Sequence, residues 1–321
     1  MNLRRWLESP FLDERFPLPL DAPFTTRMAL AEGVTKAQLT ALCRDGHLRR
    51  PIKGVYLACQ VGDSIRLRAA CLALVAPSDA VVCDRHAGWL AGAEMVLAPN
   101  EHLDLRPISM FRPSGAGRLR NTLADSGERN LIESDLMEIH GVLVTTPIRT
   151  TWDLGRLERR DRAFSGMDAM MSLGVDREEF LAGVERFKRM RWIRQLRTLA
   201  PWTDSRSESP GESVLRLRWL DCALPTPTPQ IKVYRNGEVV ARLDMGHEPL
   251  RFAAEYDGAE WHSSPERRRH DRERRGWLDR DFDWVIEPMT SVNVFGQLQD
   301  CHRLLHEGIA EARRRQGRRV G

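Results

Sequence analysis

The chain has 321 residues, of which 42% are hydrophobic and 29% are charged, and its 49 basic and 45 acidic side chains leave a formal net charge of +4. The length predicts more than one domain, and the apolar content excludes an intrinsically disordered chain. No apolar run approaches the roughly 18 residues of a membrane span, and the N-terminus turns polar before a signal-peptide core develops, so we expect a cytoplasmic protein with no membrane partner.

Neither the cysteines nor the overall charge indicates a particular function. The six cysteines form no C-x-x-C pair, which argues against a zinc site and against a disulfide framework. Basic residues do gather locally, and each gathering fits a solvated surface as well as a contact with nucleic acid. The three clusters are Arg49, Arg50 and Lys53; Arg267, Arg268, Arg269, Arg272, Arg274 and Arg275; and Arg313, Arg314, Arg315, Arg318 and Arg319.

Residues 25–57 predict two short helices followed by two short strands. A threonine precedes each helix as an N-cap, and Gly46 ends the second helix. Extended runs at 48–50 and 54–57 follow on either side of a proline. This order is typical of a winged helix-turn-helix, which we predict over residues 1–60 together with an N-terminal arm.

A winged helix suits DNA because its second helix enters the major groove while a basic wing contacts phosphates. Winged helices also bind proteins, so residue types alone leave both partners open. The residues of this region that we expect to bind nucleic acid are Lys36, Gln38, Arg44, Arg49, Arg50 and Lys53.

Residues 61–202 alternate helical and extended patterns, which predicts an α/β middle domain without a catalytic constellation. His86 lies on a helix of small residues, where a hydrogen-bonded structural histidine is favoured over a ligand. Arg149 and Asp153 lie four residues apart on a predicted helix, and we interpret them as a pair on the helix surface. The polar segment 203–211 has the composition of a linker between this domain and the next.

Residues 212–321 carry the patterns that indicate chemistry. An amphipathic helix has Glu212 in its first turn, and three strands follow as an antiparallel meander whose first turn is Asn-Gly. Asp244 lies near the end of the second strand and Glu255 near the end of the third, so we expect these carboxylates on adjacent strands. Mg²⁺ and Mn²⁺ prefer such hard oxygen ligands, although strand ends also carry acidic residues for turns and solubility.

The sequence around the third strand resembles a nuclease family. Glu255-Tyr256-Asp257-Gly258 is followed by Trp261-His262, by an arginine-rich helix and by a further strand, FDWVIEP. With Asp244 upstream, this segment resembles the very-short-patch-repair-like endonucleases, a branch of the PD-(D/E)XK superfamily, over about residues 211–305. The resemblance implies a C-terminal restriction-endonuclease-like α/β domain, so the expected fold class is α/β multidomain.

Carried onto this sequence, the resemblance implies that Asp244 and Glu255 hold the metal ion. Asp257 stands where the superfamily usually has a lysine, and an acidic side chain gives no positive charge to a phosphate. His262 is implied as a general base or as a residue that orients water, with local packing as the alternative. Glu212 is implied to reach the ion through water, with an ordinary helix N-terminal glutamate as the alternative. The residues of the arginine-rich helix that we expect to face nucleic acid are Arg268, Arg274 and Arg275.

The front half of the chain resembles a second family. FTTRMALAEGVTKAQLTALCRDGHLRRPIKGVYL is similar to the winged-helix domain of AbiEi-type antitoxins, and VTTPIRTTWDLGR is similar to a segment that follows it there. The two matches span about residues 20–160. Members of that family repress their own operon, so this resemblance implies a DNA-binding repressor with a cognate toxin protein as a partner.

Two functions therefore compete. The first is a DNA-binding protein whose endonuclease domain hydrolyses phosphodiester bonds with Mg²⁺ or Mn²⁺. The alternative, motivated by the acidic Asp257, is an AbiEi-like transcriptional repressor or antitoxin whose nuclease-fold domain is inactive. A nuclease that acts on RNA and a toxin-binding partner stay open as well, because phosphate contacts do not separate DNA from RNA. The sequence predicts no oligomeric state.

Overall fold

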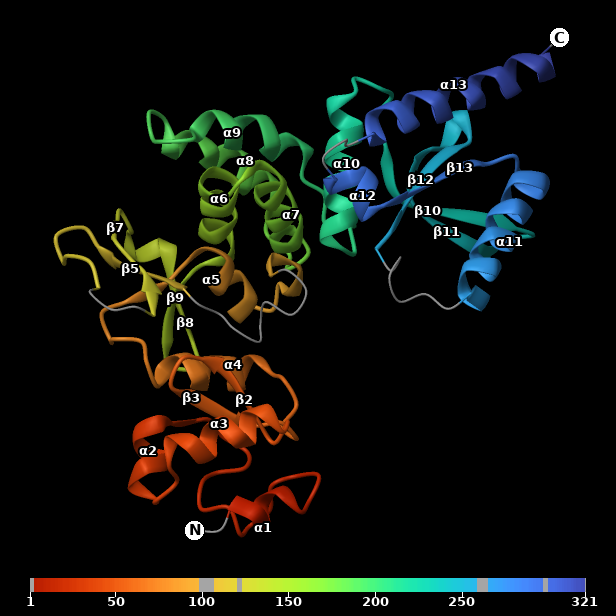
Figure 1. The fold of residues 1–321 in the computed structure, drawn as a ribbon. Coiled ribbons are helices and arrows are strands. Elements are labelled where there is room, and N and C mark those ends of the chain that lie inside the picture. The colour runs from red at the N-terminus through yellow and green to blue at the C-terminus, as the bar shows by residue number, and fades with distance from the viewer. Residues whose placement is uncertain (1–2, 98–106, 120–122, 259–264, 297–299, 321) are drawn as a thin grey trace. The chain divides into compact units, whose positions relative to one another are not determined.

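The chain is a mixed α/β protein, as its computed structural model shows (Figure 1). The structure describes all residues except 1–2, 98–106, 120–122, 259–264, 297–299 and 321. The chain forms two compact units, the first made of Met1–Leu154 and Leu173–Glu185 and the second of Gly155–Ser172 and Arg186–Gly321. None of the described helices is both long and apolar enough to cross a membrane.

The first part of the first unit contains the two helices and the two strands predicted after the N-terminal arm. Each helix is capped by a threonine hydroxyl, which accepts a 3.2 Å hydrogen bond from Met28 N at Thr25 and from Gln38 N at Thr35. One further strand is present, and the antiparallel sheet has the order β1-β3-β2. The elements are α1 (Leu3–Leu7), β1 (Phe24–Thr25), α2 (Thr26–Ala31), α3 (Lys36–Arg44), β2 (Leu48–Ile52) and β3 (Val55–Ala58).

The N-terminal arm is part of this folded region. Trp6, Leu12 and Phe16 are buried in one core with the inner faces of α2, α3 and the sheet. His47 Nε2 lies 2.7 Å from the carbonyl oxygen of Ser9, and these two groups share a hydrogen bond. The arm therefore stabilises the two-helix region as well as preceding it.

The rest of the first unit combines short helices with a sheet of order β6-β5-β4-β9-β8, on which β7 pairs with β5. Leu72, Met110 and Val144 are buried in its core. Ile52 and Val55 from the preceding strand pair belong to the same core, so the two parts of the first unit are packed together. The elements are α4 (Ile65–Ala73), β4 (Val81–Val82), α5 (Asp84–Leu90), η1 (Glu94–Val96), β5 (Ile108–Pro113), β6 (Ala124–Asp125), β7 (Glu128–Arg129), η3 (Glu133–Asp135), β8 (Leu136–Ile139), β9 (Val142–Thr145) and α8 (Arg177–Gly183), with α6 (Pro147–Leu157) and η4 (Val184–Phe187) crossing between the units.

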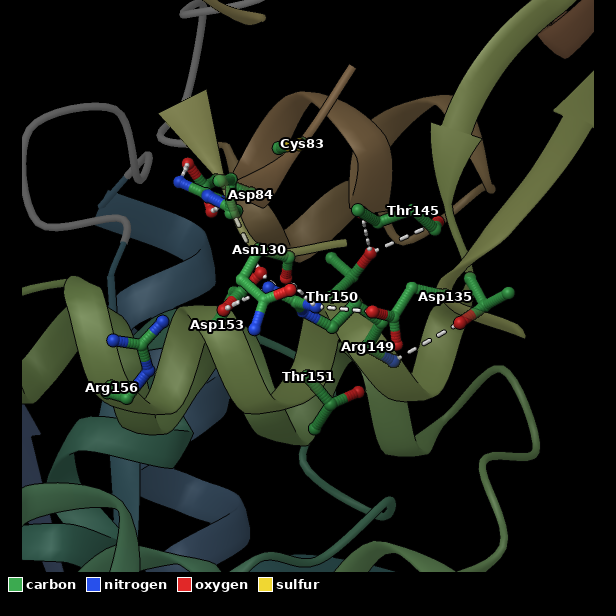
Figure 2. Close-up of polar contacts among 12 residues, drawn as sticks. Cys83, Asp84, Asn130, Asp135, Thr145, Arg149, Thr150, Thr151, Asp153 and Arg156 are labelled. Atoms are coloured by element: carbon green, nitrogen blue, oxygen red, sulfur yellow. Dashed lines mark hydrogen bonds and ion pairs between the residues drawn. The ribbon is translucent and has the colours of Figure 1, made fainter. Parts of the chain in front are cut away.

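A buried network of charges joins α6 to its surroundings in the first unit (Figure 2). Arg149 is 1% exposed, and it donates from Nε to Asp153 Oδ2 at 2.8 Å and from Nη1 to Asp135 Oδ2 at 2.6 Å. Arg129 Nη1 donates to Asp84 Oδ1 at 2.7 Å and to Asp153 Oδ2 at 3.2 Å. The prediction of a surface pair is therefore wrong. The two residues of α6 do pair, but they are buried because charged partners from outside the helix cover them.

The histidine of α5 has the structural role predicted for it. His86 is 1% exposed, and its Nδ1 accepts a hydrogen bond from Ser109 N at 3.1 Å. The imidazole therefore connects α5 to β5.

The second unit is a four-stranded sheet with helices on both faces. The order is β10-β11-β12-β13; the first three strands are antiparallel neighbours, as the predicted meander requires, and β13 runs parallel to β12. Asn236 (φ 52°) and Gly237 (φ 85°) form the predicted tight turn between β10 and β11. Figure 1 shows α11 on one face of this sheet and α10, α12 and α13 on the other. The elements are α7 (Arg160–Met171), α9 (Ile193–Leu199), η5 (Ala200–Trp202), α10 (Pro210–Asp221), β10 (Thr228–Arg235), β11 (Glu238–His247), η6 (Glu248–Leu250), β12 (Phe252–Asp257), α11 (Pro265–Phe282), β13 (Val285–Thr290), α12 (Ser291–Phe295) and α13 (Cys301–Val320).

The two compact units do not divide at 203–211, where the sequence predicts a linker. Thr203 and Ser207 are buried, and α10 begins inside this segment, at Pro210. Three ion pairs also tie α10 to α7, a helix that the sequence assigns to the middle domain. They are Arg160–Asp221 at 2.6 Å, Arg218–Asp161 at 2.5 Å and Arg216–Asp168 at 2.6 Å.

Candidate functional site

Two carboxylates of the second unit lie where β11 runs beside β12. The antiparallel register pairs Met245 with Ala254. One residue further along this register, Asp244 falls opposite Glu255, and directly opposite residues of an antiparallel pair point to the same face. The prediction that these two carboxylates lie on adjacent strands is confirmed.

Asp244 lies in a crowded acidic environment. Its Oδ2 accepts a hydrogen bond from Tyr256 N at 2.8 Å. Burial, and then the nearby carboxylate of Glu212, raise the pKa of Asp244 to about 7, and the carboxylate of Glu255 adds to this effect. The bond from Tyr256 and the guanidinium of Arg274 lower the pKa by less. Asp244 forms no ion pair with any described residue, so no cationic side chain in direct contact neutralises it.

Glu212 stands at the N-terminus of α10 and also beside Asp244. Its Oε1 accepts a hydrogen bond from the hydroxyl of Ser209 at 3.0 Å, and its Oε2 accepts from Glu208 N at 2.9 Å and from Gln230 Nε2 at 3.0 Å. Burial raises the pKa of Glu212 above its ordinary value, while these hydrogen bonds act against the shift. Glu212 is thus a helix N-terminal glutamate, which is one of the two interpretations of the sequence. It is also a neighbour of Asp244.

Gln230 belongs to the same group of residues, and the resemblance to the endonuclease family marks its position without giving it a chemical role. It lies between Pro229 and Ile231, which pair with the two neighbours of Asp244, so Gln230 falls opposite Asp244. Its backbone is left-handed, with φ of 55°, and nothing in the sequence signals that conformation for a glutamine. Its Oε1 is buried and has no hydrogen-bond partner among the described residues. An unpaired oxygen therefore lies in the strand next to the carboxylates.

A glycine allows α10 to approach this part of the sheet. A Cβ atom on Gly211 would lie 2.0 Å from the Cε1 atom of the Tyr256 ring, so no larger residue fits without movement. Because Tyr256 follows Glu255 and Gly211 precedes Glu212, this close contact brings the carboxylate of α10 to those of the strands.

Glu255 is 5% exposed, and both of its oxygens are held by arginines of α11. Oε1 accepts from Arg274 Nη2 at 2.6 Å, and Oε2 accepts from Arg275 Nε at 3.0 Å. Arg275 Nη2 also lies 3.9 Å from Asp257 Oδ2. The sequence predicts that both arginines face nucleic acid, but the structure places them on the acidic residues of the sheet.

The residues around Asp244 suit a divalent cation in part. Carboxylate and amide oxygens from Glu212, Gln230 and Asp244 are the hard ligands that Mg²⁺ and Mn²⁺ prefer. The raised pKa of Asp244 comes first from its burial and then from the neighbouring carboxylates. Glu255, however, already has two guanidinium partners. Within the described residues, no three His, Cys, Asp or Glu side chains form a group able to hold an ion. A cation bound here would therefore require Glu255 to exchange its partners.

Two of the predicted site residues of this unit cannot be placed. His262 lies outside the described residues, and so does the side chain of Arg268.

The predicted nucleic-acid-binding residues of the first unit differ in their surroundings. Gln38 Oε1 accepts from Thr35 N at 2.8 Å as part of the helix cap, and Arg49 Nη2 donates to the carbonyl oxygen of Val61 at 3.0 Å. Arg44 is exposed and pairs with its neighbour Asp45. The residues of the set that are exposed are Lys36, Arg44, Arg50 and Lys53.

Comparison with known proteins gives relatives but no activity. No family model matches the chain. Two proteins of Mycobacterium tuberculosis, the uncharacterized protein MT2308 of strain CDC 1551 and the uncharacterized protein Rv2248 of strain H37Rv, are each 32% identical to it over 262 residues. The matched region covers 81% of this chain and 92% of each relative.

Proposed function

This chain belongs to the same family as the uncharacterized protein Rv2248 of Mycobacterium tuberculosis, and we propose that it binds DNA and hydrolyses phosphodiester bonds with Mg²⁺ or Mn²⁺. In this proposal the second unit is a restriction-endonuclease-like domain. The observation that carries the proposal is the pairing of Asp244 with Glu255 across β11 and β12, near Glu212 of α10. Burial first, and then these two carboxylates, raise the pKa of Asp244 to about 7. A structural carboxylate gains nothing from such an arrangement, whereas a cation-binding carboxylate does.

The residues that would hold the ion are Asp244 and Glu255, with Glu212 placed to reach it through water. Such an ion supplies a polarised phosphoryl oxygen and a water that ionises near neutral pH. The protein itself orients the carboxylates. Tyr256 N fixes one oxygen of Asp244, and Gln230 with the helix cap fixes Glu212. Asp257 supplies no positive charge to the phosphate, so that charge must come from other residues.

We assign DNA binding to the first unit, as a winged helix. Lys36 and Arg44 lie on the exposed side of α3, eight positions apart and therefore on one face of the helix. Arg50 and Lys53 are exposed on β2 and in the turn that follows it. Cations on a helix and on an adjacent strand pair fit the contacts that a helix in the major groove and a wing on the backbone make.

Nicking of supercoiled DNA tests the proposed hydrolysis. The intact protein should nick DNA with Mg²⁺ or Mn²⁺ and not with EDTA, and Asp244→Ala or Glu255→Ala should abolish the activity. Glu273→Gln is the matched control, because Glu273 is an exposed acid on α11. Nicking that survives both alanine substitutions would exclude this site.

A second function, an AbiEi-like repressor or antitoxin with an inactive nuclease-fold domain, is favoured by the two arginines that already neutralise Glu255. Under this alternative the protein should protect its own promoter in footprinting, and Lys36→Ala combined with Arg50→Ala should weaken that binding. A cognate toxin should copurify with it. No metal-dependent nicking should appear, which separates this function from the first.

A further inference from the structure

The acidic site of the second unit lacks one charge that its proposed chemistry needs. Phosphodiester hydrolysis builds negative charge on the phosphate, and enzymes stabilise that charge with fixed cations. In the nuclease superfamily that this segment resembles, a lysine has this role, but Asp257 stands at the position of that lysine here. The chain must therefore bring a cation from another element, and α11 is the element whose basic side chains reach this end of the sheet.

The helix α11 that carries the two arginines is anchored on the sheet by packing. Leu278 follows Arg274 by four residues, on the same face of the helix, and it is fully buried in the core under that face of the sheet. The side chains of Arg274 and Arg275 are only 30% and 19% exposed, unlike the freely solvated arginines of a typical surface helix. Their distances to Glu255 are 2.6 and 3.0 Å. The position of these guanidinium groups is thus set by the fold.

We propose that Arg274 and Arg275 supply the positive charge missing at Asp257: they neutralise Glu255 in the metal-free protein, and they would bind the scissile phosphate when Glu255 holds a divalent ion. This inference rests on the hydrolytic function proposed above. Glu255 keeps a counter-charge in both states, first from the guanidinium groups and then from the ion, which matters because an unpaired buried carboxylate is strongly disfavoured. The arginines exchange only hydrogen bonds and ion pairs, so no proton leaves them.

Arginine suits this role better than lysine. Its planar guanidinium forms two parallel hydrogen bonds to a carboxylate, and it matches two oxygens of a phosphate in the same way. At Glu255 each of the two guanidinium groups donates one hydrogen bond, and a phosphate offers the same group up to two oxygen acceptors. If the ion pair were purely structural, Glu255 would need no metal ion, and the arginines no phosphate, as an alternative partner.

Metal binding separates these two roles without any measurement of activity. Titration calorimetry of the full chain with Mn²⁺ should show affinity raised about ten-fold in Arg274→Ala and in Arg275→Ala, because the ion then competes with one guanidinium for Glu255 instead of two. Glu273→Gln, on the same helix, should leave the affinity unchanged. Arg275→Lys keeps the charge, protects the fold against an unpaired Glu255, and should bind Mn²⁺ like the wild type.

Nicking assays on the same variants complete the test. The alanine variants, although they bind Mn²⁺ more tightly, should lose about 100-fold in kcat, and Arg275→Lys should recover part of that loss. Alanine variants that nick DNA at the wild-type rate, or that bind Mn²⁺ no better than the wild type, would overturn the inference and leave the hydrolytic function intact. A wild-type protein that neither binds Mn²⁺ nor nicks DNA would instead overturn the hydrolytic function and this inference together.

Discussion

The protein buries two clusters of charged residues, and they are built in opposite ways. Around Arg149 in the first unit, the aspartates Asp84, Asp135 and Asp153 each accept hydrogen bonds from a guanidinium. Around Asp244 in the second unit, the carboxylates of Glu212 and Glu255 lie nearby, and Arg274 and Arg275 both form their ion pairs with Glu255. The first cluster satisfies its own charges and the second does not. Burial of charge alone therefore does not separate a structural cluster from the site that we propose, whereas an unsatisfied charge within the cluster does.

The largest effect should come from breaking the satisfied cluster. Asp153→Ala removes the residue that both Arg149 and Arg129 contact, and it leaves two buried guanidinium groups with fewer partners. We expect a loss of about 3–5 kcal/mol in the free energy of unfolding, measured by urea denaturation. Asp45→Ala, which breaks an exposed pair with Arg44, is the control and should leave stability nearly unchanged, because solvent screens such a pair. A small effect at Asp153 would mean that the network is not structural.

Removing a charge from the unsatisfied cluster around Asp244 should raise the free energy of unfolding instead of lowering it. Asp244→Asn removes a carboxylate that the folded chain holds at a pKa of about 7, well above that of an ordinary aspartate. In the wild type the unfolded chain ionises first as the pH rises, so this carboxylate lowers stability progressively from about pH 4 to pH 7 and fully above pH 7. The amide variant escapes this loss. In EDTA at pH 8 we expect it to be about 4 kcal/mol more stable than the wild type, because a pKa raised from 3.8 to about 7 costs about 1.4 kcal/mol for each pH unit.

The same variant should lose its advantage in acid. Below about pH 4 both the folded and the unfolded wild type carry a protonated Asp244, so the difference in unfolding free energy between wild type and Asp244→Asn should vanish there. Chemical denaturation at pH 4, 6 and 8 measures the trend. A variant that is less stable than the wild type at pH 8 would show that Asp244 is a satisfied structural residue like Asp153.

How far the sequence predicts the two clusters depends on the range of the contacts involved. The hairpin at Asn236 and the carboxylates on adjacent strands follow from local rules, namely turn chemistry and the alternation of strands and turns. The buried position of Arg149 does not follow, because its cluster depends on partners distant in the sequence, such as the 45-residue separation between Arg129 and Asp84. The arginines on Glu255 were missed for the same reason. Their helix was predicted, but the partner that a helix face meets depends on tertiary packing.

The segment 203–211 shows a second reason why a prediction from amino-acid composition can fail. Its serines, proline and glycine are typical of a linker, yet each of several polar residues has a structural partner. Ser209 caps α10, and the backbone N–H of Asp204 donates to Asp168 at 2.9 Å. Gly211 is needed for contact with Tyr256. The polar and small residues of this segment are thus used for helix capping and close packing. Serine and glycine are preferred in those roles as well as in flexible linkers, so composition does not distinguish the two.

Added metal should change the unfolding free energy by a smaller amount, and only through the Asp244 cluster. Mn²⁺ at ten times its dissociation constant should stabilise the wild type by about 1.4 kcal/mol, because the ion binds only the folded chain. This appears as a rise in Tm of a few degrees. Asp244→Asn should show no such rise, whereas a conservative change in the other cluster, Asp135→Asn, should lower Tm yet keep the shift. An equal shift in wild type and Asp244→Asn would place the ion elsewhere.

The smallest effect should come from Asp257, the acidic residue at the position where the proposed nuclease fold would carry a lysine. Its carboxylate is about one-third exposed, and its distance of 3.9 Å to Arg275 makes a weak ion pair, so Asp257→Asn should change the unfolding free energy by about 0.5 kcal/mol or less. Activity can still respond, because the substitution removes a negative charge next to the guanidinium that we assign to the phosphate. A rise in nicking rate with unchanged stability would show that Asp257 weakens catalysis through that charge. An unchanged nicking rate would show that the charge of Asp257 does not affect catalysis.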